Sequence, residues 1–177
     1  MKHYNEYGNA LFTLCREDGT EEAMIRDIRC ADGVLSENPE YVKLMDTPAI
    51  SKEKKLKLID EAFGTLKEEL VSLIKILTEK RLLHSYRAVF DSFYSSYDEA
   101  MGIERVEAVT AVKMTDEQLE NLAKKLHALT GKTIIVKNTV EPEILGGVKL
   151  RYGAIQLDGS VKSKLDAFSE RLKNIVI

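Results

Sequence analysis

The hydrophobic pattern of this chain changes its period once, close to Gly102. Before that residue, apolar side chains recur every three or four positions, the spacing that places them on one face of an α-helix. After it, apolar and β-branched residues recur at every second position, as on a strand with one buried face: Val106, Ala108, Thr110, Val112 and Met114. The charge balance changes at the same place, from 14 basic and 19 acidic side chains in residues 1–102 to 12 and 10 in residues 103–177. We therefore predict two domains, 1–102 and 103–177.

Helix-breaking and capping residues divide the first domain into short helical segments. The sequence predicts helices over about residues 4–16, 21–37, 41–45, 52–63, 66–79 and 83–101. Thr20 and Ser51 are the predicted N-caps of the second and fourth of these helices. Asp18-Gly19, Asn38-Pro39, Thr47-Pro48 and Gly64 are predicted to separate the segments. The first domain is thus predicted to be a six-helix bundle.

The second domain alternates strands with helices. We predict strands at 104–114, at 133–136, and at 148–152 with a continuation at 155–157. A capping box over Thr115–Gln118 predicts a helix that carries Leu119, Leu122, Leu126 and Leu129 and ends at Gly131. Turns are predicted at Gly146, Gly147, Gly153, Asp158 and Gly159, before a last helix capped by Ser160. The fold class is therefore mostly α, with the helical bundle followed by a small α+β domain.

Composition excludes several classes of protein. The chain is 44% hydrophobic and 31% charged, as a folded globular protein is, and its net charge of -3 argues against a dedicated nucleic-acid binder. No run approaches about 18 consecutive apolar residues, so we expect no direct membrane insertion. Cys15 and Cys30 fall in apolar helical stretches, and we expect both to be buried free thiols in a reducing cytoplasm.

The sequence offers no motif for catalysis, a cofactor or a metal. Gly131-Lys132-Thr133 resembles the end of a phosphate-binding loop, but Leu126 stands where that loop needs glycine, and a helix precedes the motif instead of a strand. The three histidines are not spaced as metal ligands. We expect no catalytic residue, no cofactor and no metal site.

The widths of the apolar faces differ between helices. The helix predicted at the C-terminus has an apolar arc of roughly 100°, as expected for a helix that covers one core, and the helix at 83–101 has one of roughly 140°. The helices at 4–16 and 66–79 have arcs of roughly 200° and 220°. Two explanations stay open: both helices are central in the bundle, or both leave an outer strip for a partner helix.

Several stretches identify a resemblance that covers the whole chain. Residues 7–12 (YGNALF), 48–55 (PAISKEKK), 142–153 (PEILGGVKLRYG) and 158–165 (DGSVKSKL) resemble, in order, the signature segments of one family. The chain is similar to the delta subunit of the F-type ATP synthase, the family of the oligomycin sensitivity-conferring protein. Two departures stand out. Lys80-Arg81-Leu82 occupies the turn where family members commonly have Gly-Arg, and Gly8 replaces the usual alanine. We expect Gly8 to cost about 1 kcal/mol in helix propensity and to allow close approach of a partner helix.

The resemblance implies a non-catalytic structural subunit of a proton- or sodium-translocating ATP synthase. It implies that the first domain holds the N-terminal helix of the alpha subunit, and that the second contacts the b subunits of the peripheral stalk, so that together they resist rotational torque. The implied place is the cytoplasmic face of a bacterial membrane, peripheral and through the complex. The partner-binding residues implied for the groove between the first and fifth helices are Tyr7, Ala10, Leu11, Leu14, Leu73, Ile76 and Leu77. The alternatives are a stand-alone helical adaptor that binds an amphipathic helix and a nucleotide regulator that uses Gly131-Lys132-Thr133.

Overall fold

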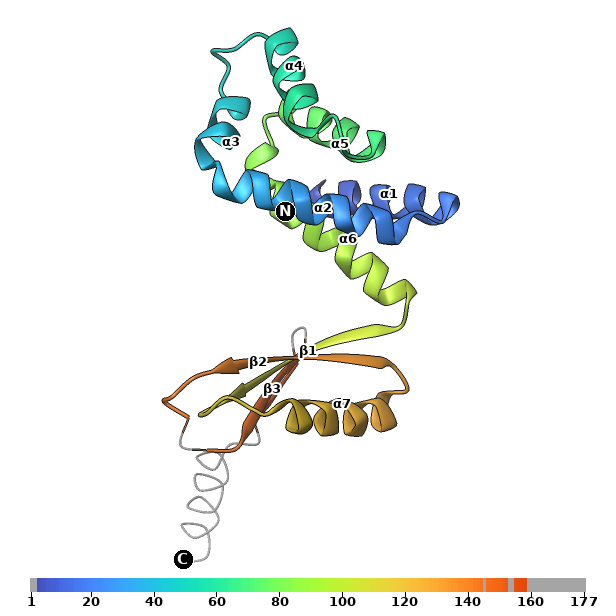
Figure 1. Cartoon of the computed structure of the whole chain (residues 1–177), viewed down its shortest axis with the longest axis vertical. Coiled ribbons are helices and arrows are strands. Elements are labelled where there is room, and N and C mark those ends of the chain that lie inside the picture. The colour runs from blue at the N-terminus through green and yellow to red at the C-terminus, as the bar shows by residue number, and fades with distance from the viewer. Residues whose placement is uncertain (1–2, 145, 153–154, 159–177) are drawn as a thin grey trace, which may run out of the picture. The chain divides into compact units, whose positions relative to one another are not determined.

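The computed structural model describes residues 3–144, 146–152 and 155–158 (Figure 1). The chain divides into two units, Met1–Ala100 and Met101–Ile177. Seven α-helices lie in the described part of the chain, six of them in the first unit and one in the second. The mostly helical class, with a helical bundle followed by a small α+β unit, is confirmed.

The helices of the first unit follow the predicted segments closely. They are α1 (His3–Asp18), α2 (Glu21–Glu37), α3 (Pro39–Asp46), α4 (Lys52–Phe63), α5 (Glu68–Glu79), the 3-10 turn η1 (Leu83–Ser85) and α6 (Tyr86–Ala100). The third helix begins two residues earlier than predicted, because Pro39 occupies its first turn, where a missing N–H is tolerated. The predicted caps Thr20 and Ser51 stand at the N-cap positions, but neither side chain makes a capping hydrogen bond.

Gly8 lies where α1 packs against α6, the closest helix pair of this unit. A Cβ atom at Gly8 would lie 2.4 Å from the carbonyl oxygen of Val89 and 2.7 Å from the nitrogen of Phe93. Beside it, the Ser92 hydroxyl donates to the carbonyl oxygen of Asn5 (3.0 Å) and to Oδ1 of Asn9 (2.8 Å). The expected close approach at Gly8 therefore occurs within the bundle, to α6, and not to a helix of another chain.

The core of the first unit draws buried apolar side chains from every helix between α1 and α6. Two aromatic edge-to-face pairs span it, Phe12 with Phe93 at a centroid distance of 5.9 Å and Tyr41 with Phe63 at 6.3 Å. Cys15 belongs to this core, but Cys30 is exposed, so the expectation of two buried thiols is wrong for Cys30. Its position on α2 falls outside the buried face of that helix, which carries Met24, Ile28, Ala31 and Leu35.

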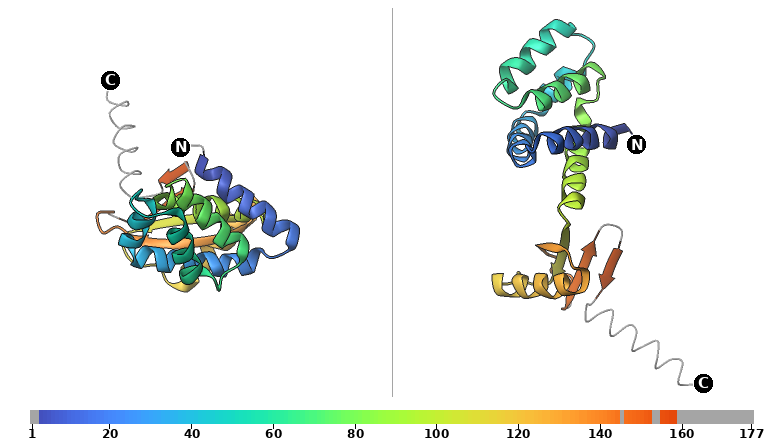
Figure 2. Two further views of the ribbon diagram at one scale, coloured as in Figure 1. Left: turned by 90° about the horizontal axis from the view of Figure 1, so that it is seen from above. Right: turned by 90° about the vertical axis from the view of Figure 1, so that its right-hand side faces the viewer.

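The second unit is built on a sheet with α7 (Asp116–Thr130) packed against it (Figures 1 and 2). Over the described residues the strand order is β2 (Thr133–Val140), β1 (Ile103–Thr110), β3 (Val148–Tyr152), β4 (Ile155–Asp158). β1 pairs with β2 in parallel and with β3 antiparallel, and β4 pairs antiparallel with β3. The buried apolar residues of this described part are Val106, Ala108, Val109 and Ile144.

The first strand ends earlier and the second later than predicted. β1 stops at Thr110, whose hydroxyl donates to the carbonyl oxygen of Val112, and Val112 is 74% exposed. The Met114 N–H donates to the side-chain Oδ1 of Asn138 on β2 (2.8 Å), not to a backbone carbonyl of that strand. β2 continues to Val140 because β1 offers it a parallel partner along its whole length, a long-range pairing that the apolar run 133–136 does not reveal.

Local signals around α7 are confirmed. The Gln118 N–H donates to the Thr115 hydroxyl (3.2 Å), and the Thr115 N–H donates to the Gln118 side chain (3.0 Å), which completes the capping box. Gly131 ends the helix with φ 71°, in the left-handed region. Gly153, Gly159 and the predicted last helix lie outside the described residues, and Asp158 is the last residue of β4.

Candidate functional site

A groove of about 420 Å³ runs between α1 and α5 of the first unit. Tyr7 on α1 lies near Lys80 at the end of α5, and Leu14 shares the groove with Glu68 and Glu69 at the start of α5, so the two helices are antiparallel along it. The residues that line the groove are Tyr7, Ala10, Leu11, Leu14, Glu68, Glu69, Ser72, Leu73 and Ile76. All the predicted partner-binding residues except Leu77 are among them.

The groove has a buried apolar floor and an exposed apolar rim. Leu11 and Leu73 form the floor, with only 3% and 6% of their surface exposed. Leu14 and Ile76 stand on the rim, 49% and 42% exposed, although both are large aliphatic side chains. Leu77 is fully buried in the bundle core and offers no surface to a partner. The exposed apolar rim is the unusual feature, because such side chains on helices normally face a core.

The two ends of the groove differ in charge. Glu68 and Glu69 lie at the end formed by the first turn of α5. At the other end the Lys80 ammonium lies 5.8 Å from the ring centroid of Tyr7, within cation–π distance. A helix placed in this groove would therefore meet acidic side chains at one end and a basic one at the other.

Side chains from other helices hold α5 in place beside α1. Oδ2 of Asp27, on α2, accepts from the Lys67 N–H at the N-terminus of α5 (2.8 Å). Lys75 of α5 pairs with Asp60 of α4 (2.5 Å). On α1, burial raises the pKa of the Cys15 thiol, so this thiol stays protonated near neutral pH and packs as a small apolar side chain in the core. The first two contacts attach α5 to α2 and α4.

The structure shows which residues make up the wide apolar arc of α5. α5 is central in the bundle and buries Leu70, Val71, Leu73, Ile74, Leu77 and Thr78. The remainder of its arc, at Ile76, is the part that faces the groove. The central place of α5 in the bundle therefore explains most of its apolar arc, and Ile76 is the part of the arc that stays exposed. The acidic pair, Ser72 and Lys80 were not predicted, because helical periodicity marks apolar positions and carries no signal for polar residues at a groove's ends.

The remaining candidates from the sequence have structural roles. Gly131-Lys132-Thr133 connects the end of α7 to the start of β2, and Lys132 pairs with Glu104 (3.5 Å), so the segment is not a phosphate-binding loop. Within the described residues, no group of three or more His, Cys, Asp or Glu side chains is arranged to hold a metal ion. Across the same residues, no helix combines the length and hydropathy needed to cross a bilayer.

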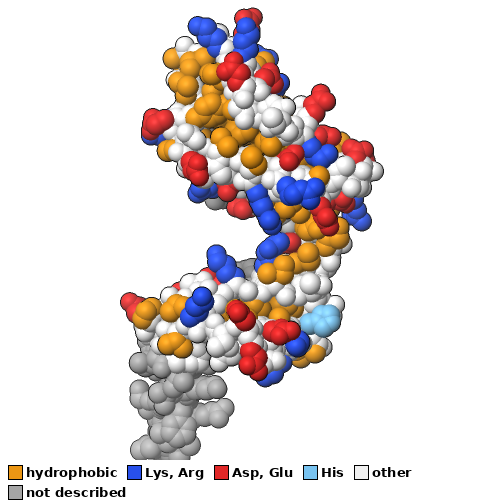
Figure 3. All heavy atoms as spheres, viewed as in Figure 1, with side chains coloured by type: hydrophobic (Ala, Val, Ile, Leu, Met, Phe, Trp, Pro, Cys, Tyr) orange, Lys and Arg blue, Asp and Glu red, His pale blue; other side chains and the backbone are white. Residues whose placement is uncertain are grey.

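The surface charges are mixed. On the face shown in Figure 3, basic and acidic side chains alternate around apolar patches, and neither sign forms a continuous field. Such a surface does not provide the positive stripe that binds a phosphate backbone. The apolar groove is thus the strongest candidate site of the first unit.

A second hollow lies in the α+β unit, at the end of β1. Its volume is about 500 Å³, and its walls include Met114, Leu122, Gly146 and Gly147. The two glycines have φ of 142° and 88°, a conformation in which a side chain would be strained. This glycine turn is part of the segment PEILGGVKLRYG.

Known proteins match this chain over almost its whole length. The family model described as ATP synthase delta (OSCP) subunit matches residues 4–172. The ATP synthase subunit delta of Leuconostoc mesenteroides subsp. mesenteroides is 30% identical, over 95% of this chain and 94% of the relative. The ATP synthase subunit delta of Beijerinckia indica subsp. indica is 31% identical, over 96% of this chain and 90% of the relative. A chain of the cryo-EM structure of the Toxoplasma gondii mitochondrial ATP synthase hexamer has the same fold, with a TM-score of 0.71, 20% identity and coverage of 97% and 98%.

Proposed function

Because the chain belongs to the ATP synthase delta (OSCP) subunit family, a family of non-catalytic structural subunits, we propose that it links the catalytic head of an F-type ATP synthase to the peripheral stalk. In this proposal the groove between α1 and α5 binds the N-terminal helix of an alpha subunit. The second unit contacts the b subunits. Together the two attachments resist the torque of rotation.

The exposed apolar rim of the groove carries this proposal. Leu14 and Ile76 face solvent on opposite walls, above a floor of Leu11 and Leu73. An amphipathic helix laid into such a groove covers apolar side chains on both walls at once, which is how helix-in-groove complexes bury their anchor residues. The acidic end at Glu68 and Glu69 would pair with basic side chains of the bound helix and so fix its direction.

The test is a titration of a peptide with the sequence of the alpha-subunit N-terminal helix into the full chain. Ile76→Asp and Ala10→Asp place a charge on the two walls, and each should weaken binding by about 2 kcal/mol or more, the scale of an interface hot spot. The matched control is Leu44→Asp, because Leu44 on α3 is 41% exposed, against 42% for Ile76, but lies outside the groove.

The free variants are compared by thermal melting. All three substitutions are at exposed positions and should change stability by less than about 0.5 kcal/mol. Unchanged affinity in folded Ile76→Asp and Ala10→Asp proteins would remove the groove from the interface. Equal loss of affinity in Leu44→Asp would show that the effect is not specific to the groove.

Attachment of the second unit to the stalk is tested at the glycine turn. Gly147 has φ 88°, so Gly147→Val should distort this turn and disturb the second unit. We expect the variant to lose binding to the b subunits while the alpha-subunit peptide still binds. Loss of both attachments together would contradict the assignment of one partner to each unit.

The proposed place of the chain is peripheral, on the cytoplasmic face of a bacterial membrane and held there by the other subunits of the synthase. The family assignment leaves no reason to retain a stand-alone adaptor unrelated to ATP synthase. A nucleotide regulator is not retained either, since its motif forms a helix-to-strand connection. A pull-down from washed membranes, with the bound chains identified by mass spectrometry, tests the whole proposal.

A further inference from the structure

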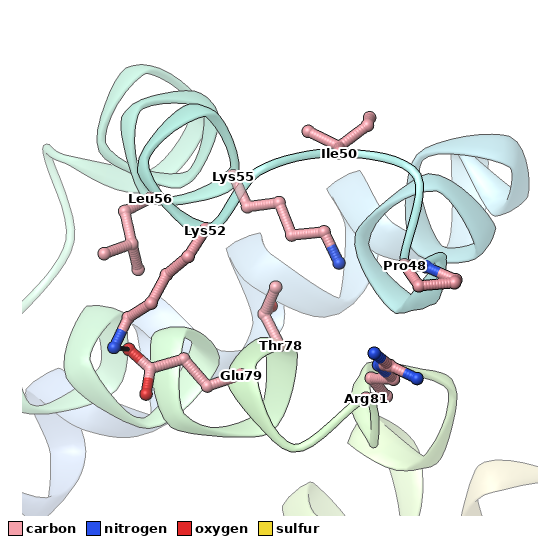
Figure 4. Close-up of a pocket in the computed structure, with 8 residues that line it drawn as sticks. All are labelled: Pro48, Ile50, Lys52, Lys55, Leu56, Thr78, Glu79 and Arg81. Carbon is pink, nitrogen blue, oxygen red and sulfur yellow. Dashed lines mark ion pairs between the residues drawn. The ribbon is translucent and has the colours of Figure 1, made fainter.

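A second pocket of the helical unit lies between α4 and the C-terminal end of α5, and it shares no lining residue with the α1–α5 groove. Its volume is about 270 Å³. Figure 4 shows the eight side chains that line it: Pro48, Ile50, Lys52, Lys55, Leu56, Thr78, Glu79 and Arg81. Three of these side chains are cationic and one is anionic, so the lining is positive although the whole chain is not.

Lys55 is buried without an acidic partner. The residue is 7% exposed, and its ammonium donates to the carbonyl oxygens of Met45 (2.5 Å) and Thr47 (2.6 Å). These bonds terminate α3 and leave one of the three ammonium donors unused. Among the described residues, no carboxylate lies within 4.0 Å of this ammonium. A buried charge is ordinarily paired, because its desolvation is otherwise uncompensated.

The hydroxyl of Thr78 is also buried, and it has no hydrogen-bond partner in the described part of the chain. The residue is 2% exposed, and among the buried polar side-chain atoms of the described residues, its Oγ1 is the one without a hydrogen-bond partner. Burying a hydroxyl without a hydrogen bond is unfavourable, so such groups in folded proteins call for a ligand or another explanation. In Figure 4 the side chains of Lys55 and Thr78 turn toward the same space.

Arg81 supplies a third donor at the mouth of the pocket. It has φ 57°, the left-handed region, and is the one non-glycine residue with positive φ in the described part of the chain. Its guanidinium forms no ion pair within 4.0 Å among those residues, whereas Lys52 and Glu79 pair with each other at 2.8 Å. The charge that remains uncompensated is therefore that of Lys55 and Arg81.

We propose that this pocket binds the phosphate group of inorganic phosphate or of a small phosphate monoester. An ammonium, a hydroxyl and a guanidinium reach it from α4, α5 and the turn after α5. Phosphate oxygens point to tetrahedral corners and accept from donors on several sides, while the two oxygens of a carboxylate lie in one plane. The bound group gives Lys55 a counter-charge and Thr78 a hydrogen-bond partner.

The test uses the full chain in phosphate-free buffer. Inorganic phosphate and glycerol phosphate are titrated separately, and sodium chloride at matched ionic strength serves as the reference for screening. Amide NMR shifts at Ile50, Thr78 and Arg81 report binding at the pocket, and the melting temperature reports stabilisation by the ligand. Comparing inorganic phosphate with glycerol phosphate shows whether free phosphate or a monoester is bound. Acetate is titrated in the same way to measure binding of a carboxylate.

Three variants separate specific binding from general effects. Arg81→Gln should weaken phosphate binding at least about tenfold, which corresponds to 1.4 kcal/mol. Lys54→Gln is the matched control, because Lys54 is an exposed cation on α4, the helix that carries Lys55, but does not line the pocket. The affinity of this variant should match that of the wild type. Thr78→Val removes only the unpartnered hydroxyl, so it should raise the melting temperature of the free chain while weakening phosphate binding.

Several results would overturn the proposal. These are the absence of any phosphate-specific shift in the wild type, equal binding by Arg81→Gln and wild type, and equal binding of acetate and phosphate. A fall in the melting temperature of free Thr78→Val would show that the hydroxyl already has a partner. None of these outcomes depends on the alpha-subunit peptide, so the proposed function stands or fails separately.

Discussion

The helical unit and the α+β unit use similar apolar patterns with different results. Both α5 and α7 carry leucines at helical spacing, but α5 buries six residues in the bundle and α7 has no fully buried residue in the described structure. Leu129, the last of the four leucines that the sequence placed on this helix, is 82% exposed. In a bundle, neighbouring helices cover the side chains of a central helix on several sides. A helix that packs on one face of a sheet is covered on one side only. The apolar pattern therefore identifies a helix without telling how deeply it is buried.

The largest predicted effect compares the stability lost when a buried side chain of the helical unit is truncated with that lost at an exposed side chain of α7. Phe93 is fully buried and packs edge-to-face on Phe12, so Phe93→Ala should lower the free energy of unfolding of the helical unit by about 3–5 kcal/mol. Leu129→Ala, in α7, should lower the free energy of unfolding of the α+β unit by less than about 0.5 kcal/mol. Urea unfolding followed by circular dichroism measures both. A large loss in Leu129→Ala would show that α7 contributes to a core after all.

A smaller effect is expected at the helix crossing of the first unit. Gly8→Ala improves helix propensity, yet its Cβ would overlap the backbone of α6, so we expect a net loss of about 1–3 kcal/mol. Gly33→Ala is the matched control, because Gly33 lies within α2 with no atom within 4 Å of an added Cβ. That variant should gain about 0.5–1 kcal/mol. If both variants were stabilised, the close approach of α1 and α6 would be disproved.

A substitution in the turn after α5 is expected to stabilise the protein. The Arg81 N–H donates to the carbonyl oxygen of Thr78 (3.0 Å) and the Leu82 N–H to that of Leu77 (2.8 Å), which together form a Schellman motif with Arg81 in its left-handed position. Glycine adopts this position without strain, so Arg81→Gly should stabilise the helical unit by about 1 kcal/mol. Arg81→Ala is the control, because alanine is strained in the left-handed conformation and should not stabilise the unit as glycine does. Equal melting temperatures for the two variants would contradict the strain.

The smallest effect belongs to the α+β unit and depends on pH. The hydroxyl of Thr139 donates to Glu107 (2.6 Å), and this bond, with the nearby Arg151, lowers the pKa of Glu107. A lowered folded-state pKa stabilises the fold above the unfolded pKa of about 4.3, and this contribution is lost as pH falls through the folded pKa. Thr139→Val should raise the Glu107 pKa toward its ordinary value, as measured by an NMR titration. An unchanged titration would show that this hydrogen bond is not the main cause.

Sequence predicted the local features of this fold well. The boundaries of the helices in the first unit, the capping box at Thr115 and the helix end at Gly131 are set by hydrogen bonds and steric limits within a few residues. The resemblance of four short segments, in a fixed order along the chain, identified the family that the comparison shows. The groove residues on α1 and α5 were proposed from the same resemblance and from the width of the apolar arcs.

Tertiary structure alone decided what each surface meets. It placed Leu77 in the core and Ile76 on the groove, turned Gly8 toward α6, exposed Cys30, and used Asp27 to cap a helix 40 residues away. It also brought Lys55, which has no acidic partner among the described residues, and the unpartnered hydroxyl of Thr78 to one pocket. Helix ends and turns follow from neighbours along the chain, and the sequence therefore determined them, whereas the length of β2 depended on its pairing with β1. The contacts of a side chain follow from how helices pack, which depends on residues far apart in the chain and so became visible only in three dimensions.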